Sequence, residues 1–191
     1  MKQEANMKRH ALILTALAAL SPSLAFAHST TGTGFSAGLL HPLMGADHLL
    51  AMLAIGIWAA LQQGSLRLAI PGAFMLALLA GFGLALTGFA LPMVESGIAL
   101  SVLLLGVVIT TAVRLPASVM LTLSVLFALF HGFAHGHEAS GSIATFAFGF
   151  MASSAALHLS GAVATQKLRA LPALTRSLGA AIAATGLWLL G

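Results

Sequence analysis

Two long stretches of this chain contain no charged side chain, and they constrain its fold more than any other feature. They run from Leu68 to Val94 and from Ala139 to Gln166. A transmembrane helix needs about 20 mostly apolar residues, so each stretch is long enough to cross a bilayer. Only 6% of the residues are charged, compared with about 25% in soluble domains. The sequence therefore predicts an all-α fold, a polytopic bundle of membrane helices.

The amino terminus has the features of a cleavable secretory signal. Lys8 and Arg9 precede the apolar run 11–20, which is too short to cross a membrane. The tripeptide Ala25-Phe26-Ala27 has the small residues that precede a cleavage site. We therefore predict that residues 1–27 are a signal peptide, that His28 is the first residue of the mature chain, and that residues 28–191 form one transmembrane domain.

The mature chain is predicted to have six spans and a fixed orientation. The spans are expected at 35–61, 68–90, 93–113, 116–136, 143–164 and 174–190. The connections on one side of this topology hold every Lys and Arg after residue 27, namely Arg67, Arg114, Lys167, Arg169 and Arg176. Lys and Arg concentrate in cytoplasmic loops. We therefore expect the mature N-terminus on the opposite, periplasmic side.

The charge and the absence of cysteine exclude several classes of partner. The net charge of +4 is explained by membrane topology, so no nucleic acid partner is predicted. The chain has no cysteine, which excludes disulfides, thiolate zinc sites and iron–sulfur clusters. The ligands that remain for a metal are imidazole, carboxylate, thioether, hydroxyl and backbone groups.

Two short segments hold most of the ionisable groups of the predicted spans. They read HPLMGADH over residues 41–48 and FHGFAHGHE over residues 130–138. Together they contain five of the eight histidines and two of the four acidic residues. An ionisable group inside a membrane costs roughly 2.5–3.5 kcal/mol by insertion scales, so such groups usually mark a pathway or a site. These segments are the candidate functional site.

Helical spacing groups the side chains of the first segment. On a continuous helix, His41 and His48 lie within about 20° of one face. Asp47 then points about 100° away from His48. It either joins the site, if Pro42 and Gly45 distort the turn, or orients an imidazole of a neighbouring element.

The spacing in the second segment also places ionisable side chains in a stripe along one face of a helix. His131, His135 and Glu138 follow i, i+4, i+7 spacing, and His137 lies about 120° off this stripe, near the outer mouth. If the first and fourth spans face each other, imidazoles from both converge with a carboxylate. Such ligands suit Ni²⁺, Co²⁺ or Zn²⁺ and do not suit Mg²⁺ or Ca²⁺.

The predicted metal ligands also include the new N-terminus, where the α-amine and imidazole of His28 form a chelate. The full set is His28, His41, Asp47, His48, His131, His135, His137 and Glu138. His158 lies within the fifth predicted span and is expected to be a structural histidine, hydrogen-bonded between helices. The other reading of the two segments is a buried polar network that joins helices.

At these residues the chain resembles the HupE/UreJ family of bacterial nickel/cobalt permeases. The first family motif, His-Pro-x-x-Gly-x-Asp-His followed by a Met, is matched by His41, Pro42, Gly45, Asp47, His48 and Met52. The second, Phe-His-Gly-x-Ala-His-Gly-x-Glu, is matched by Phe130, His131, Gly132, Ala134, His135, Gly136 and Glu138. The larger nickel/cobalt transporters use a related His-x4-Asp-His, from which this chain departs because five residues separate His41 from Asp47.

The resemblance implies uptake of Ni²⁺ or Co²⁺ across the bacterial inner membrane, often for hydrogenase, urease or cobalamin pathways. We expect a secondary permease that is not an enzyme and has no cofactor, with the metal ion as its cargo. No P-loop is present in the sequence. Two alternatives remain open: an intramembrane zinc or di-iron metalloenzyme, and a b-type haem protein with histidine ligands on facing helices.

Overall fold

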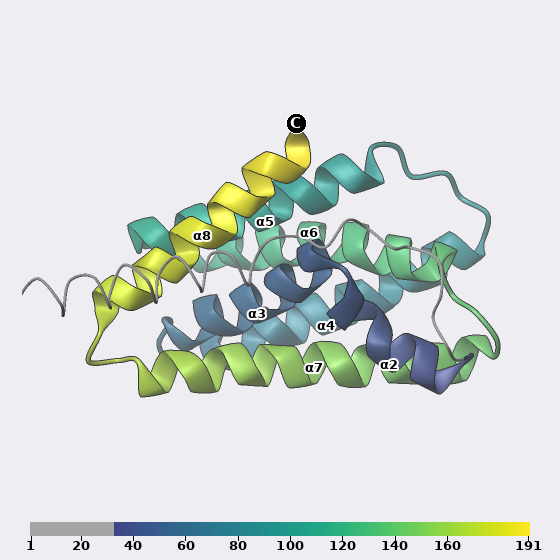
Figure 1. Ribbon diagram of the computed structural model, residues 1–191, viewed down its shortest axis with the longest axis horizontal. Helices are drawn as coiled ribbons and strands as arrows, with labels where there is room; N and C mark the ends of the chain where they lie inside the picture. The colour runs from purple at the N-terminus through teal and green to yellow at the C-terminus, as the bar shows by residue number, and fades with distance from the viewer. Residues whose placement is uncertain (1–32) are drawn as a thin grey trace, which may run out of the picture.

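The computed structural model describes residues 33–191, so the predicted signal peptide 1–27 and His28 lie outside the described residues. Within this range the chain is all-helical (Figure 1). The helices are α2 (Phe35–Met44), α3 (Ala46–Ala60), α4 (Leu66–Leu86), α5 (Val94–Thr111), α6 (Ala117–His137), α7 (Ile143–Lys167) and α8 (Pro172–Leu190). The prediction of an all-α fold is confirmed.

Five of these helices, α4 to α8, are long and apolar enough to cross a membrane, and a sixth span results if the bent pair α2 and α3 is counted as one. Large apolar side chains cover the outside of the bundle: Leu68 is 80% exposed, Leu76 75% and Phe148 69%. An apolar exterior of this kind is suited to lipid rather than to water. The chain is therefore a multi-pass membrane protein.

The span expected at 35–61 is not one continuous helix. The chain bends by 84° between α2 and α3, at Gly45, whose backbone is extended (φ −94°, ψ 124°). Pro42, one turn earlier, lacks an N–H and weakens the helical ladder around it. A Cβ atom on Gly45 would lie 2.6 Å from Oδ1 of Asp47, so glycine leaves the room that this turn needs. His41 and His48 therefore do not share a face of one helix, and another geometry must bring them together.

The helices pack in pairs that surround the broken segment. α4 lies along α6, α5 along α8, and both α2 and α3 lie against α7. The α4–α6 contact is close because Gly132 faces the backbone of Leu78 and Gly81 faces that of Leu129, with no room for a Cβ atom at either glycine. This packing fixes the carboxyl-terminal half of α6, which carries the second histidine segment.

Charged residues separate to the two ends of the bundle. The α4–α5 and α6–α7 connections lie at one end, and α7 turns into α8 at the other (Figure 1). Within the described residues, the basic side chains lie at the end of the α3–α4, α5–α6 and α7–α8 connections, whereas Glu95 and Glu138 lie at the opposite end. This separation agrees with the predicted topology.

Candidate metal site

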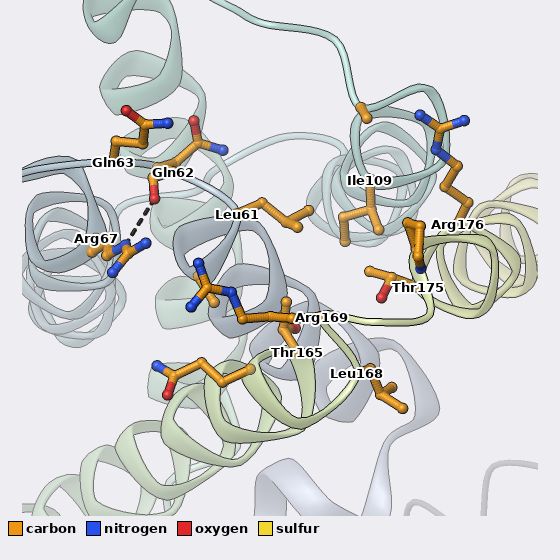
Figure 2. Close-up of a pocket in the computed structure, with 14 residues that line it drawn as sticks. Leu61, Gln62, Gln63, Arg67, Ile109, Thr165, Leu168, Arg169, Thr175 and Arg176 are labelled. Atoms are coloured by element: carbon orange, nitrogen blue, oxygen red, sulfur yellow. Dashed lines mark hydrogen bonds between the residues drawn. The ribbon is translucent and has the colours of Figure 1, made fainter.

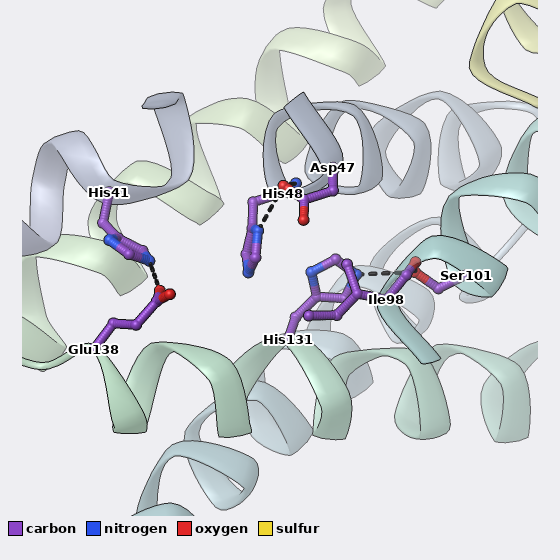
Figure 3. A network of polar contacts seen from close by, with 7 residues as sticks. All are labelled: His41, Asp47, His48, Ile98, Ser101, His131 and Glu138. Atoms are coloured by element: carbon purple, nitrogen blue, oxygen red, sulfur yellow. Dashed lines mark hydrogen bonds and ion pairs between the residues drawn. The ribbon is translucent and has the colours of Figure 1, made fainter. Parts of the chain in front are cut away.

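Four imidazole rings meet between the broken segment and α6. The ring centroid of His48 lies 4.6 Å from that of His135 and 4.8 Å from that of His131. The ring of His41 lies 4.8 Å from His135 and 6.0 Å from His48. The bend at Gly45 makes this possible, because it turns His41 on α2 and His48 on α3 toward the same side of α6 (Figure 3).

The four rings run from a partly buried to a fully buried position. The side chain of His41 is 19% exposed, and that of its neighbour Glu138 is 52% exposed. His48 is buried, and His131 and His135 are fully buried. The rings therefore form a continuous row from the acidic end of the bundle into its interior.

His48 is oriented by the residue that precedes it. The Nδ1 atom of His48 lies 2.9 Å from Oδ1 of Asp47, and the same oxygen accepts the backbone N–H of His48 at 2.8 Å. A carboxylate only accepts hydrogen bonds, so the proton of the neutral ring is on Nδ1. The other ring nitrogen, Nε2, then carries a lone pair, and it is buried with no hydrogen-bond partner among the described residues.

His131 is oriented in the same way by Ser101 on α5. The Ser101 hydroxyl donates its single proton to the carbonyl oxygen of Ile98 at 2.7 Å. Its oxygen lies 2.9 Å from Nε2 of His131 and must therefore accept a proton from that atom. Nδ1 of His131 keeps a lone pair, and this atom too is buried without a partner among residues 33–191.

His41 pairs with Glu138, which caps the carboxyl end of α6. Nε2 of His41 lies 2.6 Å from Oε2 of Glu138. This hydrogen bond is the main reason why the pKa of the Glu138 carboxyl lies below its usual value. Metal-binding histidines almost always donate their second N–H to a carboxylate or another oxygen, which fixes the tautomer. His41, His48 and His131 all have this arrangement.

The fourth ring, His135, packs between aromatic and imidazole neighbours. It stacks on Phe150 of α7, with centroids 4.8 Å apart and planes 17° apart. Both its nitrogens are buried, and neither finds a partner in the described part of the chain. Buried polar atoms without partners cost about 1–3 kcal/mol each and are rare in folded proteins. A cluster of four such imidazole nitrogens on three rings is therefore unusual.

The side chains do not yet form a coordination sphere. Among residues 33–191, no group of three or more His, Asp or Glu side chains is already arranged to hold a metal ion. The ring centroids of neighbouring imidazoles nevertheless lie only 4.6–4.8 Å apart.

Two further histidines lie outside the row. His137 is exposed and packs against Phe133, with ring centroids 4.8 Å apart. His158 is buried on α7, where its ring lies 5.2 Å from that of Phe74. Its Nε2 has no partner among the described residues, so the expected hydrogen bond at that atom is not found there.

Ser101 and the aromatic residues of α7 are the parts of the site that the sequence did not reveal. Ser101 lies four positions after Gly97, a spacing of small residues that indicates only close packing of helices. Phe146 and Phe150 line the row beside His41 and His135. Neither α5, which carries Ser101, nor α7, which carries the two phenylalanines, has a motif that links it to the histidine segments. The sequence therefore held no signal that predicts these contacts.

Comparison with known proteins identifies the family. The family model described as "HupE / UreJ protein" matches residues 15–189. The chain belongs to the HupE/UreJ family. The "Protein HupE" of Rhizobium leguminosarum bv. viciae is 41% identical over 161 residues, which cover 80% of this chain and 82% of that protein. No solved structure matches the chain significantly.

Membership of the HupE/UreJ family indicates that the chain is a transporter. The family consists of transporters rather than enzymes and is associated with nickel and cobalt transport. The resemblance predicted from the two histidine segments is therefore confirmed. The haem alternative also disagrees with the geometry, because facing imidazoles in direct contact leave no space for a planar macrocycle between them.

Proposed function

We propose that this HupE/UreJ chain carries Ni²⁺ or Co²⁺ across the bacterial inner membrane into the cytoplasm, without hydrolysis of ATP. One observation supports this most strongly: buried imidazoles on separate helices donate one N–H to an oxygen and leave the other nitrogen free. Neutral imidazole nitrogen is the preferred ligand of late first-row metals.

The row of rings offers the ion a graded path. At the outer end, the half-exposed carboxylate of Glu138 and the partly buried His41 are the first ligands to replace water around the cation. His135 and His48 follow, and His131 is the innermost ring. Asp47 supplies negative charge beside His48. His28 and His137 are proposed to collect the ion at the mouth.

The driving force follows from the charge of the cargo. An inside-negative membrane potential contributes about 2.3 kcal/mol per elementary charge per 100 mV, and thus roughly 4.6 kcal/mol for a divalent cation. This supports inward movement without a coupled reaction. The orientation with the basic end in the cytoplasm agrees with this direction, because Lys and Arg concentrate in cytoplasmic loops.

Uptake of radiolabelled metal tests the proposal. Cells that express the wild type are expected to accumulate ⁶³Ni²⁺ or ⁵⁷Co²⁺, with each ion competing against the other. His48→Ala and His131→Ala are expected to reduce accumulation to the level of cells without the protein, at unchanged abundance in the membrane. Normal accumulation by both variants would reject the proposed function.

A further inference from the structure

A cavity with a partly polar lining lies at the basic end of the bundle, away from the histidine row. It encloses about 400 Å³, within the range of about 300–1,000 Å³ that is usual for small-molecule sites. Its walls come from the α3–α4 connection, the end of α5 and the α7–α8 connection (Figure 2). The two segments that form the histidine row do not contribute to it.

Three arginines line this cavity, and no acidic residue does. Arg67 reaches it from the start of α4, Arg169 from the α7–α8 connection and Arg176 from the first turns of α8 (Figure 2). Among residues 33–191 the ion pairs involve only histidines with Asp47 or Glu138. Figure 2 shows the guanidinium groups of Arg67 and Arg169 on the same side of the cavity and that of Arg176 at its opposite edge, beside Ile109. No carboxylate from the described part of the chain pairs with any of them.

Further hydrogen-bond donors lie around the arginines. Nε of Arg67 donates to the carbonyl oxygen of Gln62 at 2.8 Å, which fixes the guanidinium at the cavity wall. The amides of Gln63 and Gln166 also line the cavity. The amino end of α8, which has no side-chain cap, begins at this wall with Pro172. Helix N-termini carry partial positive charge and uncapped N–H groups.

We propose that this cavity binds the phosphate group of an anionic ligand, either the headgroup of an anionic phospholipid or free phosphate. The planar fork of arginine matches phosphate oxygens in pairs, so a cavity with arginines at its edges suits this ligand. Basic pockets between membrane helices at the cytoplasmic side are suited to phospholipid headgroups. Leu61, which lines the cavity and is 43% exposed, offers an apolar edge for an acyl chain.

The chain provides matched controls for this proposal. Arg114 and Lys167 lie at the same end of the bundle but do not line the cavity. If binding depended on the overall charge of this end, all five basic residues would contribute similarly. If it depends on the cavity, only Arg67, Arg169 and Arg176 matter.

The test measures binding to the purified full chain in neutral detergent. In one arm, native mass spectrometry compares bound phosphatidylglycerol with phosphatidylcholine. In the other, the melting temperature is followed as inorganic phosphate is added against a chloride control. Arg169→Gln and Arg176→Gln are compared with Arg114→Gln and Lys167→Gln, and gel filtration verifies that each variant is folded. Arg176→Lys keeps the positive charge but removes the planar guanidinium group that binds two phosphate oxygens at once.

We expect the wild type to retain several-fold more phosphatidylglycerol than phosphatidylcholine. The two cavity variants should lose this preference, Arg176→Lys should retain part of it, and the two control variants should equal the wild type. Stabilisation by inorganic phosphate, lost in the same cavity variants, identifies free phosphate as the ligand instead. Equal losses in all four glutamine variants, or no response to either ligand, would overturn the proposal.

Discussion

The ring of His48 on α3 lies 4.8 Å from the ring of His131 on α6, and the two planes are nearly perpendicular at 87°. Each ring is held by an oxygen on its far side, that of Asp47 or Ser101. The backbones of α3 and α6 make few close approaches to each other, so the imidazoles fill the space between these helices. This arrangement leads to four predictions.

The first prediction separates the row of rings from the histidine beside it. His135→Ala removes a fully buried ring that contacts both His41 and His48, and it should abolish metal accumulation. His137→Ala removes an exposed ring outside the row and should raise the KM for uptake while leaving the maximal rate near that of the wild type. Radiolabelled uptake at varied metal concentration measures both. An equal loss of uptake in the two variants would contradict the proposal that the ion passes along the buried row of rings and not past His137.

The second prediction concerns the carboxylate that orients His48. Asp47→Asn keeps the size of the side chain but removes its charge and fixes His48 less firmly. Loss of such a partner typically lowers metal affinity by about 10- to 100-fold, and we expect a corresponding rise in the concentration for half-maximal uptake. Glu95→Gln is the control, because Glu95 is exposed at the start of α5. A similar effect of both changes would indicate a general role of negative charge.

The third prediction tests whether Ser101 sets the tautomer of His131. Ser101→Ala removes the acceptor for Nε2–H, so it should weaken uptake by about 10- to 100-fold while the protein remains in the membrane. Ser124→Ala is matched to it, since Ser124 is also fully buried but donates to the carbonyl oxygen of Ile70. That variant should lose about 1 kcal/mol of stability and keep normal uptake. The idea fails if Ser101→Ala transports normally.

The fourth prediction concerns the bend. A Cβ atom on Gly45 would lie 2.6 Å from Oδ1 of Asp47 and 3.3 Å from Nδ1 of His48. Gly45→Ala should therefore displace this pair and reduce uptake strongly. A Cβ atom on Gly83 in α4 would meet nothing within 4 Å, so Gly83→Ala should leave uptake unchanged and add roughly 0.5–1 kcal/mol of helix stability. Uptake and melting temperature of the two variants provide the comparison.

Much of the architecture could be predicted from the sequence because hydrophobic length is a strong signal in membrane proteins. The spans expected at 116–136 and 143–164 correspond closely to α6 and α7. The family was also predicted correctly, because its two histidine motifs have fixed spacing.

The details of the site could not be predicted in the same way. A helical projection assumes a continuous helix, and the 84° bend at Gly45 invalidates that assumption for His41 and His48. Pro42 and Gly45 indicated distortion, but not its angle. The contact of Ser101 with His131 joins two helices, and nothing in the local sequence of either one specifies the other.

The break at Gly45 also has a consequence for the main chain. The last four carbonyl groups of a helix have no intrahelical donor, and non-helical backbone at membrane depth occurs only beside protein or water. Leu43 and Met44 are 44% and 68% exposed, so the last turn of α2 has hydrocarbon on its outer side. The oxygens of that turn must therefore be sheltered within the protein or hydrated. Carbonyl oxygens at the ends of broken helices are known to coordinate cations, so in the proposed pathway the peptide backbone at this point would offer oxygen ligands beside the imidazole nitrogens and the carboxylate of Glu138.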